Sequence, residues 1–134
     1  MGDPVRRHCE CGIEGAAARA REETRRFFED ARAAAHAAPC SLQDSVLLVV
    51  SELVTNAVHH TRGPCSFDIV WSRGGIDVDV TDSSPEPPTP RPPVPEGTAG
   101  GYGWPLVHRL ADEVDVRPAP GGGKSIHVHF ATAS

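Results

Sequence analysis

The spacing of apolar side chains predicts two helices in the first half of the chain. Residues 14–38 are rich in Ala, Arg and Glu and are followed by Pro39, which predicts one long surface helix. Residues 42–60 repeat apolar side chains at steps of three and four, the pattern of a helix with a buried stripe. Further apolar side chains widen this stripe, so we expect the second helix to lie in the core.

The second half of the chain predicts a β-sheet. Residues 67–71 and 76–81 are rich in β-forming side chains and flank a turn that contains two glycines, which predicts a β-hairpin. Further strands are expected at residues 114–116 and 125–130, and a short helix at residues 106–112. This order predicts an α+β fold in which helices cover one face of a mixed, mostly antiparallel sheet.

Length and local composition predict one domain with two irregular segments. A chain of 134 residues can form a single core, and we expect the domain to comprise residues 14–134. Residues 1–13 are polar and are expected to form a flexible tail. Zinc binding at Cys9 and Cys11 is the less favoured alternative, because no second pair of ligands stands at a regular spacing. Residues 83–103 are rich in Pro and Gly and predict a long loop that acts as a lid.

Charge and hydropathy exclude several classes of function. The formal net charge of −5 does not favour a nucleic-acid or acidic-membrane partner. No apolar run is long enough to span a bilayer, and the N-terminus lacks the apolar stretch of a signal peptide. The four cysteines are irregularly spaced and are expected to be free thiols. We therefore expect a cytoplasmic protein without nucleic-acid or membrane partners.

Candidate chemistry begins within the predicted core helix. Glu52 and Asn56 are four residues apart and share a helical face, and His59 falls close to the same stripe. A carboxylate can orient or deprotonate an attacking hydroxyl, and an amide oxygen is a hard ligand that suits Mg²⁺. Considered in isolation, the same two residues more often cap or bond a neighbouring loop, because buried polar groups need partners. Both interpretations stay open at this point.

Two further signals follow. Asp82 continues the every-second-residue pattern of the apolar Val78 and Val80, so its carboxylate should project from the apolar side of the strand. There it could accept a hydrogen bond from an exocyclic amine. Residues 97–107 are a glycine-rich stretch that runs into a helix, where backbone N–H groups can approach phosphates. An ordinary turn aspartate and a flexible loop are the alternatives. Residues 123–125 are not a Walker A motif and residues 101–103 are not a dinucleotide fingerprint, because the flanking glycines and elements are missing.

The order and spacing of these signals resemble the GHKL superfamily of ATP-binding proteins (gyrase, heat-shock chaperone, histidine kinase, MutL). Residues 51–60, Ser-Glu-Leu-Val-Thr-Asn-Ala-Val-His-His, closely resemble its N box. Asp82 resembles its G1 box, residues 101–107 resemble its G2 box, and residues 122–128 look like its closing strand. The short length and the Ser-Glu-Leu sequence at residues 51–53 look most like those of the anti-sigma-factor serine/threonine kinases and their actinobacterial relatives.

The resemblance implies a two-layer α/β sandwich that binds ATP and Mg²⁺. Glu52 would be the general base, and Asn56 would hold Mg²⁺ against the phosphates. Asp82 would recognise adenine with Ser125 near it, and the glycines would cover the phosphates as part of the lid. The residues that the resemblance places in the nucleotide site are Asn56, His59, Asp82, Ser84, Gly100, Gly101, Tyr102, Gly103, Trp104, Leu106 and Ser125.

The resemblance also implies two activities. One is transfer of the ATP γ-phosphate to a serine or threonine of an anti-sigma-factor antagonist, and the other is binding of a sigma factor; a homodimer is compatible with it. The chain departs from the family pattern after Asp82, where Ser83 replaces a glycine, and at Tyr102 and Trp104, where Arg and Leu are common. These departures support the alternative of a catalytically inactive module that binds a sigma factor or another partner, with or without ATP. A histidine-kinase catalytic domain is less favoured, because no helix pair with a phospho-acceptor histidine precedes the domain.

Overall fold

The computed structural model describes residues 5–12, 14–61, 65–83, 103–120 and 122–132 of the chain. Within these ranges the elements, in chain order, are β1 (Val5–Cys11), α1 (Ala16–Ala33), α2 (Cys40–Thr61), β2 (Cys65–Ser72), β3 (Gly75–Asp82), α3 (Gly103–Leu110), β4 (Glu113–Pro118) and β5 (Lys124–Ala131). The predicted helices and strands of residues 14–130 are therefore present, with shifted ends.

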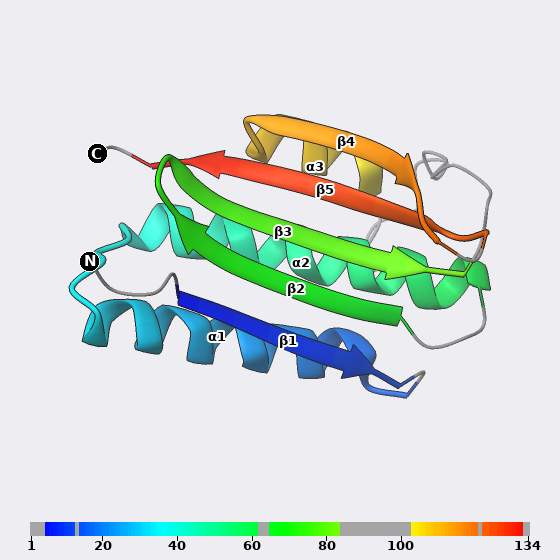
Figure 1. The fold of residues 1–134 in the computed structure, drawn as a ribbon, viewed down its shortest axis with the longest axis horizontal. Helices are drawn as coiled ribbons and strands as arrows, with labels where there is room; N and C mark the ends of the chain where they lie inside the picture. Colours follow the sequence, from blue (N-terminus) through cyan, green and yellow to red (C-terminus); the bar gives the residue numbers. More distant parts are fainter. Residues whose placement is uncertain (1–4, 13, 62–64, 84–102, 121, 133–134) are drawn as a thin grey trace, which may run out of the picture.

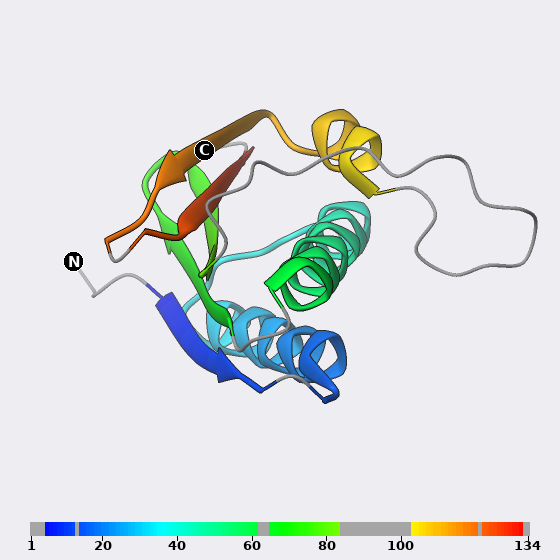
Figure 2. The ribbon, with the colours of Figure 1, turned by 90° about the vertical axis from the view of Figure 1, so that its right-hand side faces the viewer.

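The elements form two layers, as predicted. The strands lie in the order β1-β2-β3-β5-β4, and each neighbouring pair is antiparallel. The three helices cover one face of this sheet, and α2 packs between α1 and α3 (Figures 1 and 2). The α+β fold with helices on one face is confirmed. Among the described residues, none of the helices combines the length and the apolar character that a membrane crossing requires.

Strand alternation and the stripe of α2 build the core between the layers. On β2, β3 and β5 every second side chain is buried against the helices, as the period of a strand requires. The predicted stripe of α2, formed by Val46, Val50, Leu53 and Ala57, is buried at 3% exposure or less. The core helix of the sequence prediction is therefore the central helix of the fold.

The first residues of the chain differ from the prediction of a flexible tail. Residues 5–11 form β1, the edge strand that pairs with β2. Cys9 and Cys11 face the core and are buried, because a thiol behaves as a small apolar side chain. The guanidinium group of Arg7 lies 3.0 Å from the carboxylate of Glu23 and 2.9 Å from that of Asp30, both on α1. The polar side chains that indicated a tail therefore include Arg7, which links β1 to α1.

The burial of the thiols predicts that one cysteine reacts much faster than the others. Cys9, Cys11 and Cys65 are buried, and burial raises the pKa of the Cys9 thiol to about 11, whereas Cys40 is exposed. Because the thiolate is the reactive form, we expect a maleimide or an aromatic disulfide reagent to titrate a single fast thiol in the native protein. Cys40→Ser should remove that phase, and a fast thiol that remains in this variant would contradict the burial of the other three.

Candidate functional site

The residues of the predicted site that the structure describes gather at one end of the molecule. Asp82 ends β3 and pairs in the sheet with Lys124, which begins β5. The C-terminal end of α2 lies at this same end of the sheet, and so does the beginning of α1 (Figure 1). Figure 2 looks onto this end and shows α3 beside α2. Segments that are distant in the sequence therefore lie at the same end of the molecule.

The carboxylate of Glu52 and the amide of Asn56, both on α2, are buried in the protein. Glu52 is 6% exposed and Asn56 is 7% exposed, and the Oε2 atom of Glu52 is fully buried. They lie one turn apart on the helical face between the buried stripe and the half-buried Thr55. A buried carboxylate is costly, which fits a group that is kept for chemistry better than a surface residue of an amphipathic helix.

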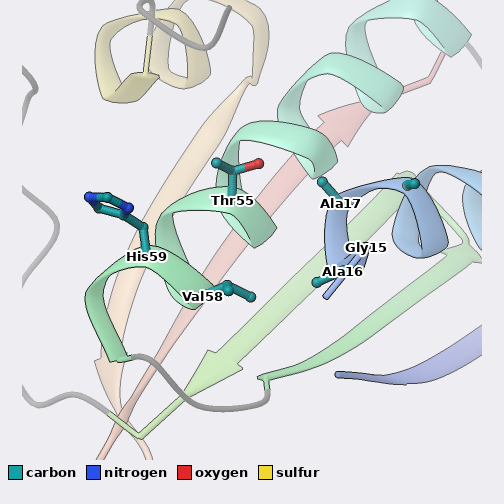
Figure 3. Close-up of a pocket in the computed structure, with 7 residues that line it drawn as sticks. Gly15, Ala16, Ala17, Thr55, Val58 and His59 are labelled. Carbon is teal, nitrogen blue, oxygen red and sulfur yellow. The ribbon is translucent and has the colours of Figure 1, made fainter. Parts of the chain in front are cut away.

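His59 is exposed and lies beside a cavity between α1 and α2. The cavity has a volume of about 300 Å³ and is also lined by Thr55, Val58 and the first residues of α1. In Figure 3 the imidazole of His59 points away from Gly15, which precedes α1, and from Ala16, which begins it. His59 thus stands at the border between this cavity and the face of α2 that carries Asn56.

Asp82 lies on the helix side of the sheet, as its parity predicts, and is bound by Lys124. The Nζ atom of Lys124 donates to Oδ1 of Asp82 at 3.1 Å and lies 3.0 Å from Oδ2. The side chains of Lys124 and Asp82 are 7% and 2% exposed. Sequence reasoning missed Lys124, although its alternation with the buried Ile126 and Val128 places it on the same face as Asp82.

The glycine before Lys124 is required by the close approach of two strands. A Cβ atom at Gly123 would lie 1.9 Å from the backbone oxygen of Asp82 and 2.9 Å from the Cα atom of Ser83. The backbone of residue 123 therefore packs directly on the end of β3. This contact fixes where Lys124 meets the carboxylate.

The structure places Ser125 differently from the prediction. Ser125 pairs with Thr81, and the two hydroxyl oxygens are 3.2 Å apart. Because neighbouring residues of a strand face opposite sides, Ser125 lies on the face of the sheet away from Asp82 and from the helices. The adenine-recognising role suggested for its hydroxyl has no support in this geometry.

The glycine-rich signal is only partly within the described residues. Ser84, Gly100, Gly101 and Tyr102 lie outside them, as does the predicted lid apart from its ends, Ser83 and Gly103. Gly103 begins α3, three residues earlier than predicted. The following Trp104 and Leu106 are half-buried, and the indole of Trp104 packs edge-on against His108 at 4.7 Å between ring centroids. The aromatic side chain at this G2-box position thus lies against its own helix.

Two of the described side chains carry groups that could bind parts of a nucleotide with Mg²⁺. Within the described ranges, no group of three or more His, Cys, Asp or Glu residues could hold a metal ion. Magnesium bound to a nucleotide needs only one or two protein ligands, because phosphates and waters supply the rest. The amide of Asn56 can provide such a ligand, and the carboxylate of Asp82 suits the amine of a base.

Comparison with known proteins agrees with this arrangement. The family described as Histidine kinase-like ATPase domain matches residues 13–129. An anti-sigma F factor of Pasteuria penetrans is 34% identical over 96 residues, which span 60% of this chain and 62% of that protein. The crystal structure of the RsbU and RsbW domains of Rv1364c from Mycobacterium tuberculosis superimposes with a TM-score of 0.68 at 17% identity, over 94% of this chain and 32% of that one. With a match over most of its length, the chain belongs to the family of histidine kinase-like ATPase domains.

Proposed function

We propose that the protein is an ATP-binding regulatory protein, an anti-sigma factor that phosphorylates a serine or threonine of an antagonist protein. The observation that carries this proposal is the buried pair of Glu52 and Asn56 on α2, a helix whose C-terminal end lies at the end of the sheet where β3 presents Asp82. A module that only bound a protein partner would have no use for a costly buried carboxylate one turn from a magnesium ligand.

Each residue has a distinct role in this proposal. The carboxylate of Asp82 accepts a hydrogen bond from the adenine amine, and the amide oxygen of Asn56 holds Mg²⁺. The bound Mg²⁺ would neutralise the charge of the phosphates. Glu52 accepts the proton of the attacking serine or threonine hydroxyl, which is the step that a correctly oriented carboxylate can accelerate. The N-terminus of α3, at Gly103, offers backbone N–H groups and a positive dipole end toward phosphates.

The partners follow from the relatives and belong to the proposal. The Pasteuria penetrans protein is named an anti-sigma F factor, and the chain spans 62% of its length. We propose that this chain likewise binds a sigma factor and is released from it through an antagonist. A cytoplasmic location and a homodimer are parts of the same proposal.

A catalytically inactive regulatory module is the second candidate, and one observation favours it. The carboxylate of Asp82 is held by Lys124 and is 2% exposed, so a base can meet it only if the surroundings open. In such a module the sigma factor would bind irrespective of phosphoryl transfer.

The experiment that separates the two candidates is a phosphorylation assay with defined partners. The protein is incubated with Mg-ATP and a candidate antagonist, and the antagonist is examined by mass spectrometry for phosphate on Ser or Thr. Binding of the cognate sigma factor is measured with and without ATP. Phosphate on the antagonist is expected together with ATP-dependent binding of the sigma factor. Sigma-factor binding with no phosphate on any antagonist would establish the inactive module instead.

A further inference from the structure

Three buried thiols lie together on the helix side of β1 and β2. The Sγ atoms of Cys9 and Cys11 are 3.4 Å apart. Cys11 is the cross-strand partner of Cys65, and the thiols of these two residues share a hydrogen bond. All three residues are free thiols and are at most 5% exposed. The proposed function uses none of them.

Backbone geometry distinguishes the two pairs of sulfur atoms. Cross-strand partners in an antiparallel sheet have Cα atoms roughly 4.5–5.5 Å apart, within the range of about 4.4–6.8 Å that disulfides span. Cys9 and Cys11 are two residues apart on one strand, so their Cα atoms are about 6.6 Å apart and their Cβ atoms project in parallel. The pair of Cys11 and Cys65 is therefore the one that can form a disulfide with little movement of the backbone.

The hydrogen bond between these two thiols makes Cys65 the more reactive member of the pair. The bond lowers the pKa of Cys65 and raises the pKa of Cys11, because Cys11 donates its proton toward the sulfur of Cys65. The thiolate is the form that attacks an oxidant. Cys11 is the last residue of an edge strand, and the ends of strands open locally at a small cost in free energy, so a small oxidant can reach the pair.

We propose that Cys11 and Cys65 form a reversible cross-strand disulfide when the protein meets a peroxide, and that this bond holds the end of β1 against β2. The thiolate sulfur of Cys65 attacks one oxygen of hydrogen peroxide, so that an S–O bond forms, the O–O bond breaks and the departing hydroxide takes up a proton to become water. The sulfur of Cys11 then attacks that of Cys65; the S–S bond forms, the S–O bond breaks, and a second water leaves with the proton of Cys11. Two thiols and one hydrogen peroxide thus give one disulfide and two waters.

The disulfide would restrain a part of the molecule beside the candidate site. Cys65 begins β2 next to the end of β3, because Ser66 pairs with Thr81, and the end of β1 lies at this same end of the sheet (Figure 1). The chain leads from β1 into α1, whose first residues line the cavity beside His59. Oxidation therefore restrains the strand that leads into one wall of this cavity.

The test is oxidation of the native protein by hydrogen peroxide, followed by mass spectrometry. All samples carry Cys40→Ser, because the exposed thiol of Cys40 could link two copies of the chain. The oxidised protein should lose about 2 Da, the mass of two hydrogen atoms, and regain it with dithiothreitol. A glutamate-specific protease cuts after Glu10, between Cys9 and Cys11, so the peptide that is linked to Cys65 identifies the partner. The midpoint of urea unfolding should rise on oxidation, since the bond closes a long loop of the unfolded chain.

Variants within the same cluster are the matched controls. Cys9→Ser removes a thiol of similar burial but leaves the proposed pair, so it should still lose the two hydrogen atoms and gain in urea midpoint. Cys11→Ser and Cys65→Ser should form no disulfide and show no gain. If either of these two fails to fold by circular dichroism, the peptide mapping decides alone, because it needs neither of them.

The remaining outcomes would overturn the inference. They are a disulfide between Cys9 and Cys11, a pair that oxidises only in urea, and oxygen added to the cysteines without an S–S bond. A mapped bond between Cys11 and Cys65 with an unchanged urea midpoint would overturn the restraint of β1. None of these outcomes bears on nucleotide binding, so the proposed function is decided by its own experiment.

Discussion

Replacing Glu52 by Gln is expected to lower the rate of phosphoryl transfer to an antagonist by about 10²–10⁴-fold, the usual contribution of a positioned general base. Gln keeps the shape of the side chain in its buried place on α2 but cannot take the proton of an attacking hydroxyl. Because the proposed function assigns the chemical step to Glu52 and nucleotide binding to Asn56 and Asp82, the affinity for Mg-ATP should stay nearly unchanged. Single-turnover phosphorylation at saturating ATP measures this rate.

Asp44→Asn is the matched control for that experiment. Asp44 is an exposed carboxylate near the beginning of the same helix, far from the end that carries the site. Its replacement also removes one negative charge from α2, so it tests whether charge alone matters. A Glu52→Gln variant as active as Asp44→Asn would contradict the assignment of Glu52 as the base.

Replacing Lys124 by Met is expected to lower the free energy of unfolding by about 3–5 kcal/mol, because it leaves the buried carboxylate of Asp82 without its ammonium partner. The free energy of unfolding of an ordinary domain is roughly 5–15 kcal/mol, so the variant stays folded unless the wild-type value lies near the lower end of that range. Urea denaturation of both proteins measures this loss.

A second change in the same pair distinguishes the buried charge from lost packing. Lys124→Met combined with Asp82→Leu leaves no charge behind, and it should recover most of the stability that Lys124→Met loses. Arg117→Met, at an exposed pair, should cost no more than about 1 kcal/mol. A double variant as unstable as Lys124→Met alone would show that the loss comes from packing and not from an unpaired charge.

The sequence predicted the elements whose patterns are long and regular. The stripe of α2 and the alternation of β3 gave the core helix, the hairpin and the side of the sheet on which Asp82 lies. These predictions succeeded because a buried face leaves a period of 3.6 or 2 in the chain. The same helical period predicted that Glu52 and Asn56 lie on one face of α2.

The errors came from features that depend on contacts between distant segments. The polar composition of residues 5–11 predicts a tail where the structure has the edge strand β1, because only Cys9 and Cys11 alternate as buried side chains. The partners of Arg7 lie on α1, so the sequence around β1 does not show them. Lys124 was missed in favour of Ser125, although its alternation with the buried Ile126 and Val128 places it on the inward face of β5. The pairing register of β3 with β5 then shows that Lys124 lies opposite Asp82. A shift of one residue exchanges the two faces of a strand.

The most direct measurement of the central claim is a calorimetric titration of the protein with ATP, with and without Mg²⁺, alongside Asn56→Ala. If the end of the molecule that carries Asn56 and Asp82 is a nucleotide site, the wild-type protein binds ATP in a Mg²⁺-dependent manner and Asn56→Ala loses that dependence. No binding at millimolar ATP, or equal Mg²⁺-dependent binding by both proteins, would contradict the account.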